Sequence, residues 1–115
     1  MSRHETMVRL QNMLDHAREA TAMAAGKTRQ DLDSDRKLNL ALVRLLEVIG
    51  EAAGRMPVED RAQFPRIPWA RIIALRNRLI HGYDSVDFDI LWQIINHDLP
   101  PLIMELEQIV PPRSG

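Results

Sequence analysis

The sequence predicts an all-α fold, an up-and-down bundle of four to five main helices that forms a single domain over residues 1–110. Three observations lead to this prediction. Apolar residues recur at helical spacing along the chain, and no stretch shows the alternation of a half-buried strand. Prolines, glycines and polar clusters separate these periodic segments. The 115 residues suffice for one hydrophobic core but not for two. Residues 111–115 are expected to form a disordered tail.

Composition limits the classes of function. Apolar residues make up 45% and charged residues 27% of the sequence, which is typical of a globular protein in water. No apolar run approaches the roughly 18 residues of a membrane span, and the N-terminus lacks the pattern of a secretory signal. The absence of cysteine excludes disulfides and thiolate chemistry. We therefore expect a cytoplasmic protein.

The first two helices are predicted from clear apolar stripes. A helix from about residue 4 to 25 carries Met7, Leu10, Met13, Leu14 and Ala17. The segment AGKTRQDLDSD then indicates a loop, and Ser34 is a candidate N-cap for a second helix from about 35 to 55. The core face of that helix comprises Leu38, Leu42, Leu45, Leu46, Ile49, Ala52, Ala53 and Met56.

A third helix follows a proline-rich segment. Pro57 and Pro65 interrupt the chain and leave room for one short helical turn at VEDRAQ. The third helix is expected to begin near Pro68, a favourable first-turn residue, and to run to about His81. Gly82 is well suited to end it.

Two further helices complete the predicted bundle. Asp84 or Ser85 can cap a helix that carries Phe88, Leu91, Trp92 and Ile95. Asp98 can cap the last helix, and Pro100 and Pro101 fit its first turn. The apolar face of this last helix comprises Leu102, Ile103, Leu106 and Ile109.

The net charge of −1 hides an uneven distribution along the chain. Residues 55–78 contain six arginines against Glu59 and Asp60, whereas residues 83–115 contain six acids against Arg113. The arginines could form a basic strip that follows a phosphate backbone. Alternatively, they form a solvated face that the acidic C-terminal part balances.

Arg76 stands out in the predicted third helix. On a helical wheel it falls near the middle of the apolar arc, whereas Asn77 and His81 share one flank and Arg71 and Arg78 point to the far side. An arginine in an apolar stripe must either reach water or find an acceptor.

The second helix offers candidate partners for Arg76 on the face opposite its core stripe. Glu47 and Glu51 lie one turn apart there, beside Leu40, Val43 and Gly50. They form either a solvated pair or a site where one carboxylate holds Arg76 by a charge-assisted hydrogen bond, single or bidentate. The neighbouring apolar residues and glycine indicate a second contact surface, with another helix or with another subunit.

The residues around Arg76 suit metal-independent cleavage of RNA without a cofactor. His81 at a helix end, where the dipole favours its protonated form, can exchange protons with a hydroxyl or a leaving oxygen. Arg76 can stabilise charge on a phosphoryl group, and Asn77 can orient either of them. By spacing alone, a structural arginine with a helix-capping histidine remains an alternative. The other histidines, at 4, 16 and 97, show no metal-ligand spacing.

The segment RNRLIHGY resembles the signature of HEPN-domain proteins. LLEVIGEAAGRMP and IPWARIIALRNRLIHGYDSVDFDILWQIINHDLPPLI resemble the HepT-like subgroup, so the resemblance covers about 70 residues. It implies a helical bundle that forms a homodimer, with the motifs of two subunits facing each other across a cleft. By position, it implies that Arg76 and His81 are the catalytic pair and that Asn77 supports them.

The resemblance also implies a biological role. Such proteins are metal-independent endoribonuclease toxins of type II toxin–antitoxin pairs, and the antitoxin is a minimal nucleotidyltransferase of the MntA type. Tyr83 matches the tyrosine to which related antitoxins attach AMP. An alternative within the same resemblance is a non-catalytic accessory or substrate-binding subunit of a nucleotidyltransferase.

Overall fold

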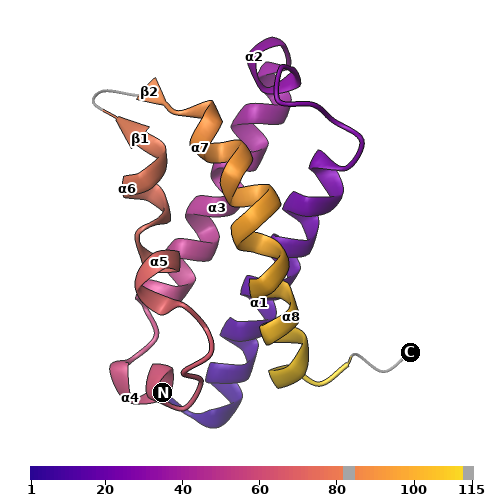
Figure 1. The fold of residues 1–115 in the computed structure, drawn as a ribbon. Helices are drawn as coiled ribbons and strands as arrows, with labels where there is room; N and C mark the ends of the chain where they lie inside the picture. Colours follow the sequence, from indigo (N-terminus) through magenta and orange to yellow (C-terminus); the bar gives the residue numbers. More distant parts are fainter. Residues whose placement is uncertain (82–84, 113–115) are drawn as a thin grey trace.

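The computed structural model describes residues 1–81 and 85–112, and it confirms the all-α prediction (Figure 1). Three long helical segments form the body: α1 (Arg3–Ala24), α3 (Arg36–Gly54) and a C-terminal segment. The C-terminal segment joins α7 (Phe88–Gln93), a π-helical turn η1 (Ile94–Asp98) and α8 (Leu99–Ile109). Helix α1 packs against both α3 and α8, so its apolar stripe is covered from two sides.

Shorter elements connect the long helices. They are α2 (Asp31–Ser34), α4 (Val58–Ala62), α5 (Trp69–Ile73), α6 (Leu75–Leu79), β1 (Ile80–His81) and β2 (Ser85–Val86). The predicted helical turn at VEDRAQ is thus confirmed as α4. Helices α5 and α6 run along the side of α3, and β1 and β2 form a small antiparallel pair above them (Figure 1).

The core lies between the three long segments and α5–α6. Its largest fully buried side chains include Leu10, Met13, Leu42, Leu46, Ile49, Ile72, Leu75, Leu79 and Leu91. These positions lie on the apolar stripes that the periodicity identified, which explains why the all-α class and the order of the long helices could be predicted. Within the described residues, no helix combines the length and apolar character that a membrane span needs.

The predicted N-cap Ser34 is wrong, because Ser34 ends the short helix α2. The amide of Asp35 donates to the carbonyl of Asp31 at 2.8 Å, which closes α2. Asp35 then caps α3, and its carboxylate accepts the amide of Leu38 at 3.1 Å. The buried amide of Asn39 donates to the carbonyl of Leu32 at 2.9 Å and ties the two helices together.

The N-caps of the last two helices also differ from the prediction. Ser85 belongs to β2 and Asp84 lies outside the described residues, whereas Asp87 caps α7 by accepting the amides of Asp89 and Ile90 at 3.0 and 3.1 Å. Asp98 makes no capping hydrogen bond, because its carboxylate turns toward two arginines. The chain passes from α7 to α8 through η1 without a break. The prolines do lie in the first turn of α8, as predicted.

The predicted third helix is not continuous. It separates into α5 and α6 at Ala74, whose ψ of 1° leaves the helical region, and α6 ends at Leu79. The carbonyl of Leu79 accepts the amide of Asp87 at 2.8 Å, and Ile80 and His81 pair with Val86 and Ser85. These bonds to the following strand replace the next helical turn. The predicted helix end at Gly82 lies outside the described residues, as do residues 113–115 of the expected tail.

Gly50 shows what the opposite face of α3 contacts. A Cβ added at Gly50 would lie 3.2 Å from the carbonyl oxygen of Ile72 in α5. The glycine therefore permits close packing of α3 on α5, so this part of the predicted second surface meets another helix. Leu40, nearer the start of α3, remains 52% exposed.

Candidate active site

Arg76 projects into solvent from α6, and its predicted place in an apolar stripe is wrong. Its side chain is 66% exposed, whereas the flanking Leu75 and Leu79 are fully buried. The fully buried side chains of α5 and α6 are Ile72, Leu75 and Leu79, and they form a narrower stripe than the predicted apolar arc. Arg76 lies beside this stripe, so its side chain meets water instead of the core.

Glu47 is the carboxylate that Arg76 meets. The Nε atom of Arg76 lies 3.6 Å from an oxygen of Glu47, which is largely buried by its surroundings. Glu51 instead faces Arg44 at 3.6 Å. The Arg76–Glu47 distance is that of an ion pair and exceeds hydrogen-bonding range, so the predicted bidentate hydrogen bond is absent between these residues. The two terminal nitrogens of Arg76 have no hydrogen-bond partner among the described residues and can face a ligand.

His81 lies in β1, beyond the end of α6, and not in the last turn of a helix as predicted. Its side chain is 58% exposed, and its Nε2 atom lies 3.6 Å from an oxygen of Asp87. The other oxygen of Asp87 caps α7, so this carboxylate is fixed from two directions. Asp87 can therefore orient the imidazole. The sequence reasoning missed Asp87, although an Asp before an apolar helix start is a cap signal.

The strand pairing explains how His81 and Asp87 meet. Because β1 and β2 are antiparallel, Ile80 lies opposite Val86 and His81 opposite Ser85. Asp87 follows directly, with its amide bonded to Leu79. Residues six apart in the chain are thereby brought to the same end of α7. Asn77 is exposed on α6, and no hydrogen bond to its side chain is seen within the described residues. Tyr83 lies outside the described residues.

Arg71 and Arg78, which the helical wheel placed opposite the apolar arc, converge on Asp98. The carboxylate of Asp98, with only 5% of its side chain exposed, accepts Arg71 Nε at 2.6 Å and Arg78 Nη1 at 2.8 Å. Burial raises the pKa of Asp98, but the hydrogen bonds from Arg78 and Arg71 outweigh it, so the pKa of this carboxyl is lowered. This cluster fastens α5 and α6 to η1, and it explains why Arg78 is not available for phosphate.

The charge distribution is therefore closer to the second interpretation, a basic face balanced by C-terminal acids. Arg66 faces Glu105 at 3.9 Å, and Arg71 and Arg78 share Asp98. Arg61 donates to the backbone carbonyls of Met56 and Gly54, at 2.8 and 3.3 Å. Of the six arginines in residues 55–78, Arg55 makes no ion pair or side-chain hydrogen bond within the described residues, and Arg76 meets Glu47 without a hydrogen bond.

The guanidinium of Arg76 and the amide of Asn77 are exposed on α6, and the imidazole of His81 is exposed on β1, which follows α6 directly. Arg76 lies near Glu47 and His81 near Asp87, and both side chains remain open to solvent. A guanidinium can bind an anionic phosphoryl group, and an imidazole can exchange a proton with an oxygen of the substrate. Within residues 1–81 and 85–112, no three His, Asp or Glu side chains gather as ligands for a metal ion.

Comparison with known proteins relates the sequence of this chain to a family. The model of the HepT-like family, described as "Ribonuclease HepT-like", matches residues 13–109. A protein of Thermococcus cleftensis named "Probable ribonuclease HepT" is 36% identical over 80 residues, which are 70% of this chain and 73% of the relative. A Methanocaldococcus jannaschii protein named a "Putative RNase" is 31% identical over 93% of this chain and 98% of its own length. No solved structure shows a significant match.

Proposed function

The chain belongs to the HepT-like ribonuclease family, and from this premise we propose that it is a metal-independent endoribonuclease. The observation that carries the proposal is the exposed pair of Arg76 and His81, each held by its own carboxylate. Exposure suits a substrate as large as RNA, which must approach the site from solvent. Each carboxylate lies 3.6 Å from its partner and helps to orient it, which reduces the ordering cost when substrate binds.

The proposed reaction is an internal transfer at phosphorus. The ribose 2′-oxygen forms a bond to the adjacent phosphorus while the bond from phosphorus to the 5′-oxygen breaks. The products are a 2′,3′-cyclic phosphate and a free 5′-hydroxyl, so no water or cofactor is consumed. His81 exchanges the protons that leave the 2′-oxygen and reach the 5′-oxygen. Arg76 stabilises the charge on the non-bridging oxygens, and Asn77 supports the arginine or the substrate.

We also propose that the chain acts as a homodimer, with the two motifs facing each other across a cleft. Arg76 and His81 lie on the outer surface of the chain, as a shared cleft requires. Leu40 on the exposed side of α3 gives an apolar contact close to this edge. A dimer would also provide a second imidazole, so that one histidine could accept a proton while the other donates one.

Cleavage without metal is the direct test of the proposed activity. The purified chain is expected to cut single-stranded RNA in the presence of EDTA and to leave cyclic phosphate ends, because the proposed chemistry uses side chains alone. Labelled RNA resolved by gel electrophoresis measures the rate, and mass spectrometry identifies the ends. RNA that stays intact in EDTA would contradict the proposal. A stable complex with a nucleotidyltransferase would then favour the accessory-subunit alternative.

The proposed biological role is that of the toxin in a type II toxin–antitoxin pair, with an MntA-type nucleotidyltransferase as antitoxin. That enzyme would attach AMP to Tyr83, two residues after His81. Added phosphates would bring negative charge and bulk to the edge where RNA approaches, and both oppose binding.

Modification of Tyr83 can be measured directly. After incubation with such a transferase and ATP, the intact mass is expected to rise by whole AMP units, and RNA cleavage is expected to fall with it. Tyr83→Phe keeps the ring but removes the acceptor oxygen, so its mass should stay constant. A Tyr83→Phe chain that gains the same mass as the wild type would place the modification elsewhere.

A further inference from the structure

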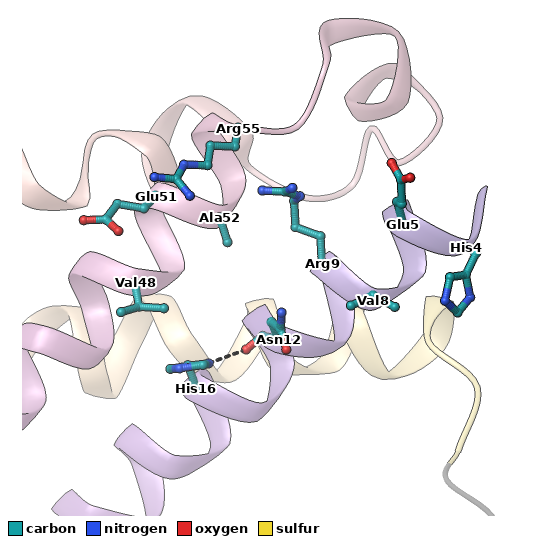
Figure 2. Close-up of a pocket in the computed structure, with 10 residues that line it drawn as sticks. All are labelled: His4, Glu5, Val8, Arg9, Asn12, His16, Val48, Glu51, Ala52 and Arg55. Carbon is teal, nitrogen blue, oxygen red and sulfur yellow. Dashed lines mark hydrogen bonds between the residues drawn. The ribbon is translucent and has the colours of Figure 1, made fainter. Parts of the chain in front are cut away.

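A second feature lies beside the C-terminal half of α3, the helix that also carries Glu47, the partner of Arg76. A cavity of about 460 Å³ opens between α1 and α3 (Figure 2). Its volume falls in the range of sites for small ligands. Its lining combines arginines with apolar side chains, and we call it the α1–α3 pocket. The lining includes Arg9, His16, Val48, Glu51, Ala52 and Arg55.

The two arginines of the pocket lack the partners that most arginines of this chain have. The Nε atom of Arg9 is buried without a hydrogen-bond partner among the described residues. Arg55 has no ion pair and no side-chain hydrogen bond within the same residues, unlike its neighbours Arg61 and Arg66. Figure 2 shows Arg9 reaching from α1 toward the part of α3 that carries Ala52 and Arg55. The Nε atom of Arg9 has almost no exposed surface, so a ligand would be held by the terminal nitrogens of Arg9 and Arg55, for which an anion supplies acceptors.

The remainder of the pocket suits a flat ring. Val48 and Ala52 give an apolar surface on α3 (Figure 2). On α1, His16 places Nδ1 2.6 Å from the carbonyl oxygen of Asn12, and in the tautomer protonated at Nδ1 it donates to that oxygen. This contact fixes the imidazole as a possible stacking surface. Unpaired RNA bases are commonly held by stacking on such side chains and by hydrogen bonds to their edges.

The carboxylates near the pocket restrict what can bind. Glu51 faces Arg44, so part of its charge is compensated, while Glu5 lines the other end. Carboxylates repel additional phosphates but can accept hydrogen bonds from the amino groups of bases. The pocket therefore fits one phosphate at the arginines with a base beside it, and it does not fit a densely charged polyphosphate.

The position of the pocket relates it to the candidate active site. Glu51 lies one helical turn after Glu47, the partner of Arg76, and Arg55 lies one turn further. Arg55 is thus about 12 Å from Glu47 along the axis of α3. A stacked nucleic-acid strand covers this length in about three or four nucleotides, at roughly 3.4 Å each. RNA with its scissile phosphate at Arg76 would reach the pocket within a few nucleotides.

We propose that the α1–α3 pocket is a second RNA-binding site of this chain, which holds one unpaired nucleotide a few positions from the cleavage point. Arg9 and Arg55 bind its phosphate, and the floor formed by Val48, Ala52 and His16 holds its base. The assignment of this ligand rests on the proposed ribonuclease function. The site is distinct from Arg76 and His81, and it makes cleavage depend on the length of the substrate.

Substrates of two lengths test the proposal. A dinucleotide reaches Arg76 but not the pocket, whereas an octanucleotide reaches both. Arg9→Gln and Arg55→Gln are each expected to weaken octanucleotide binding about fivefold to tenfold. Each should also reduce the slope of log affinity against log salt by about 0.7. Cleavage of the dinucleotide should stay at the wild-type rate. Fluorescence anisotropy measures binding separately from cleavage.

Arg36→Gln is the matched control, because it removes an exposed arginine from the start of the same helix. It lies about 28 Å along α3 from Arg55, and it should bind the octanucleotide like the wild type. Pocket variants that bind and cut both substrates like Arg36→Gln would overturn the RNA site while the ribonuclease function stands. A wild-type chain that binds the octanucleotide through the pocket but never cuts it would support the site and contradict the ribonuclease function. Variants that change the oligomeric mass but not the RNA affinity would make the pocket a contact between copies and overturn the proposal.

Discussion

Replacing either Arg76 or His81 with alanine is expected to slow RNA cleavage at least about 100-fold and to leave the fold intact. Loss of a general acid–base group or of one charge-stabilising donor typically costs a factor of this size or more. The fold should persist because both side chains are mostly exposed, and each lies 3.6 Å from its carboxylate, too far for a hydrogen bond. Exposed ion pairs of this kind contribute little to stability.

Two other side chains provide matched controls for these variants. Arg44 is 65% exposed and lies 3.6 Å from Glu51, which nearly reproduces the exposure and pairing of Arg76. His97 is an exposed histidine on η1, away from β1. Arg44→Ala and His97→Ala should cut a dinucleotide within about threefold of the wild-type rate. The measurement is the initial rate in EDTA, with circular dichroism to confirm folding. Equal rates for Arg76→Ala and Arg44→Ala would show that Arg76 takes no part in the chemistry.

The parts of the fold that could be predicted depend on local signals. The helices α1 and α3 have long apolar stripes, and α8 has prolines in its first turn, so their existence and order follow from periodicity and punctuation. Caps were less predictable, because Ser34, Asp35 and Asp87 all belong to residue types that cap helices. The choice among them depends on which backbone amides the tertiary structure leaves unpaired.

The break at Ala74 could not be predicted, since nothing in the sequence of α5 and α6 forbids a continuous helix. Gly50 packs closely on Ile72, the amide of Asp87 bonds to Leu79, and β1 pairs with β2 around the ends of these segments. The contact between Gly50 and Ile72 joins residues far apart in the chain. The helical wheel placed Arg76 within an apolar arc and left Glu47 and Glu51 open as its partner, and the structure shows Glu47.

The candidate site was predictable as a set of residues but not as a geometry. The segment RNRLIHGY identified Arg76, Asn77 and His81 by resemblance, and their catalytic roles remain predictions. Asp87 was missed because the predicted helix continued to His81, whereas the two residues meet through the pairing of β1 with β2. The helical wheel placed Arg71 and Arg78 opposite the apolar arc, and the buried acceptor that they share at Asp98 was not foreseen.

Asp98→Asn is expected to have the largest effect on stability among single polar substitutions, a loss of about 2 kcal/mol in the free energy of unfolding at pH 7. Removing one partner from a buried ion pair costs roughly 3–5 kcal/mol when the other charge stays buried. Here Arg78 is largely enclosed, but Arg71 is mostly exposed and can turn toward water. The expected loss of about 2 kcal/mol is therefore smaller than that range. The melting temperature should fall by about 8 to 12 °C. Asparagine has the same shape as aspartate, so no cavity contributes to the loss.

The pH dependence separates this ionic contribution from a packing defect. Because the pKa of Asp98 is lowered in the folded protein from its ordinary value of 3.8, the carboxylate stabilises the fold fully above that value. The contribution is lost as the pH falls through the folded pKa, which lies below 3.8. The difference between wild type and Asp98→Asn in urea unfolding should therefore be constant near neutral pH and shrink below about pH 4.

Glu105→Gln is the control, because Glu105 lies on α8 and faces the highly exposed Arg66 at 3.9 Å. Its loss should cost less than about 0.5 kcal/mol. A difference for Asp98→Asn that persists unchanged at low pH would assign the effect to packing instead of charge. Since Asp98 fastens α5 and α6 to η1, its loss should also loosen the segment that carries Arg76. RNA cleavage by Asp98→Asn is then expected to decline at temperatures where Glu105→Gln still cuts at the wild-type rate.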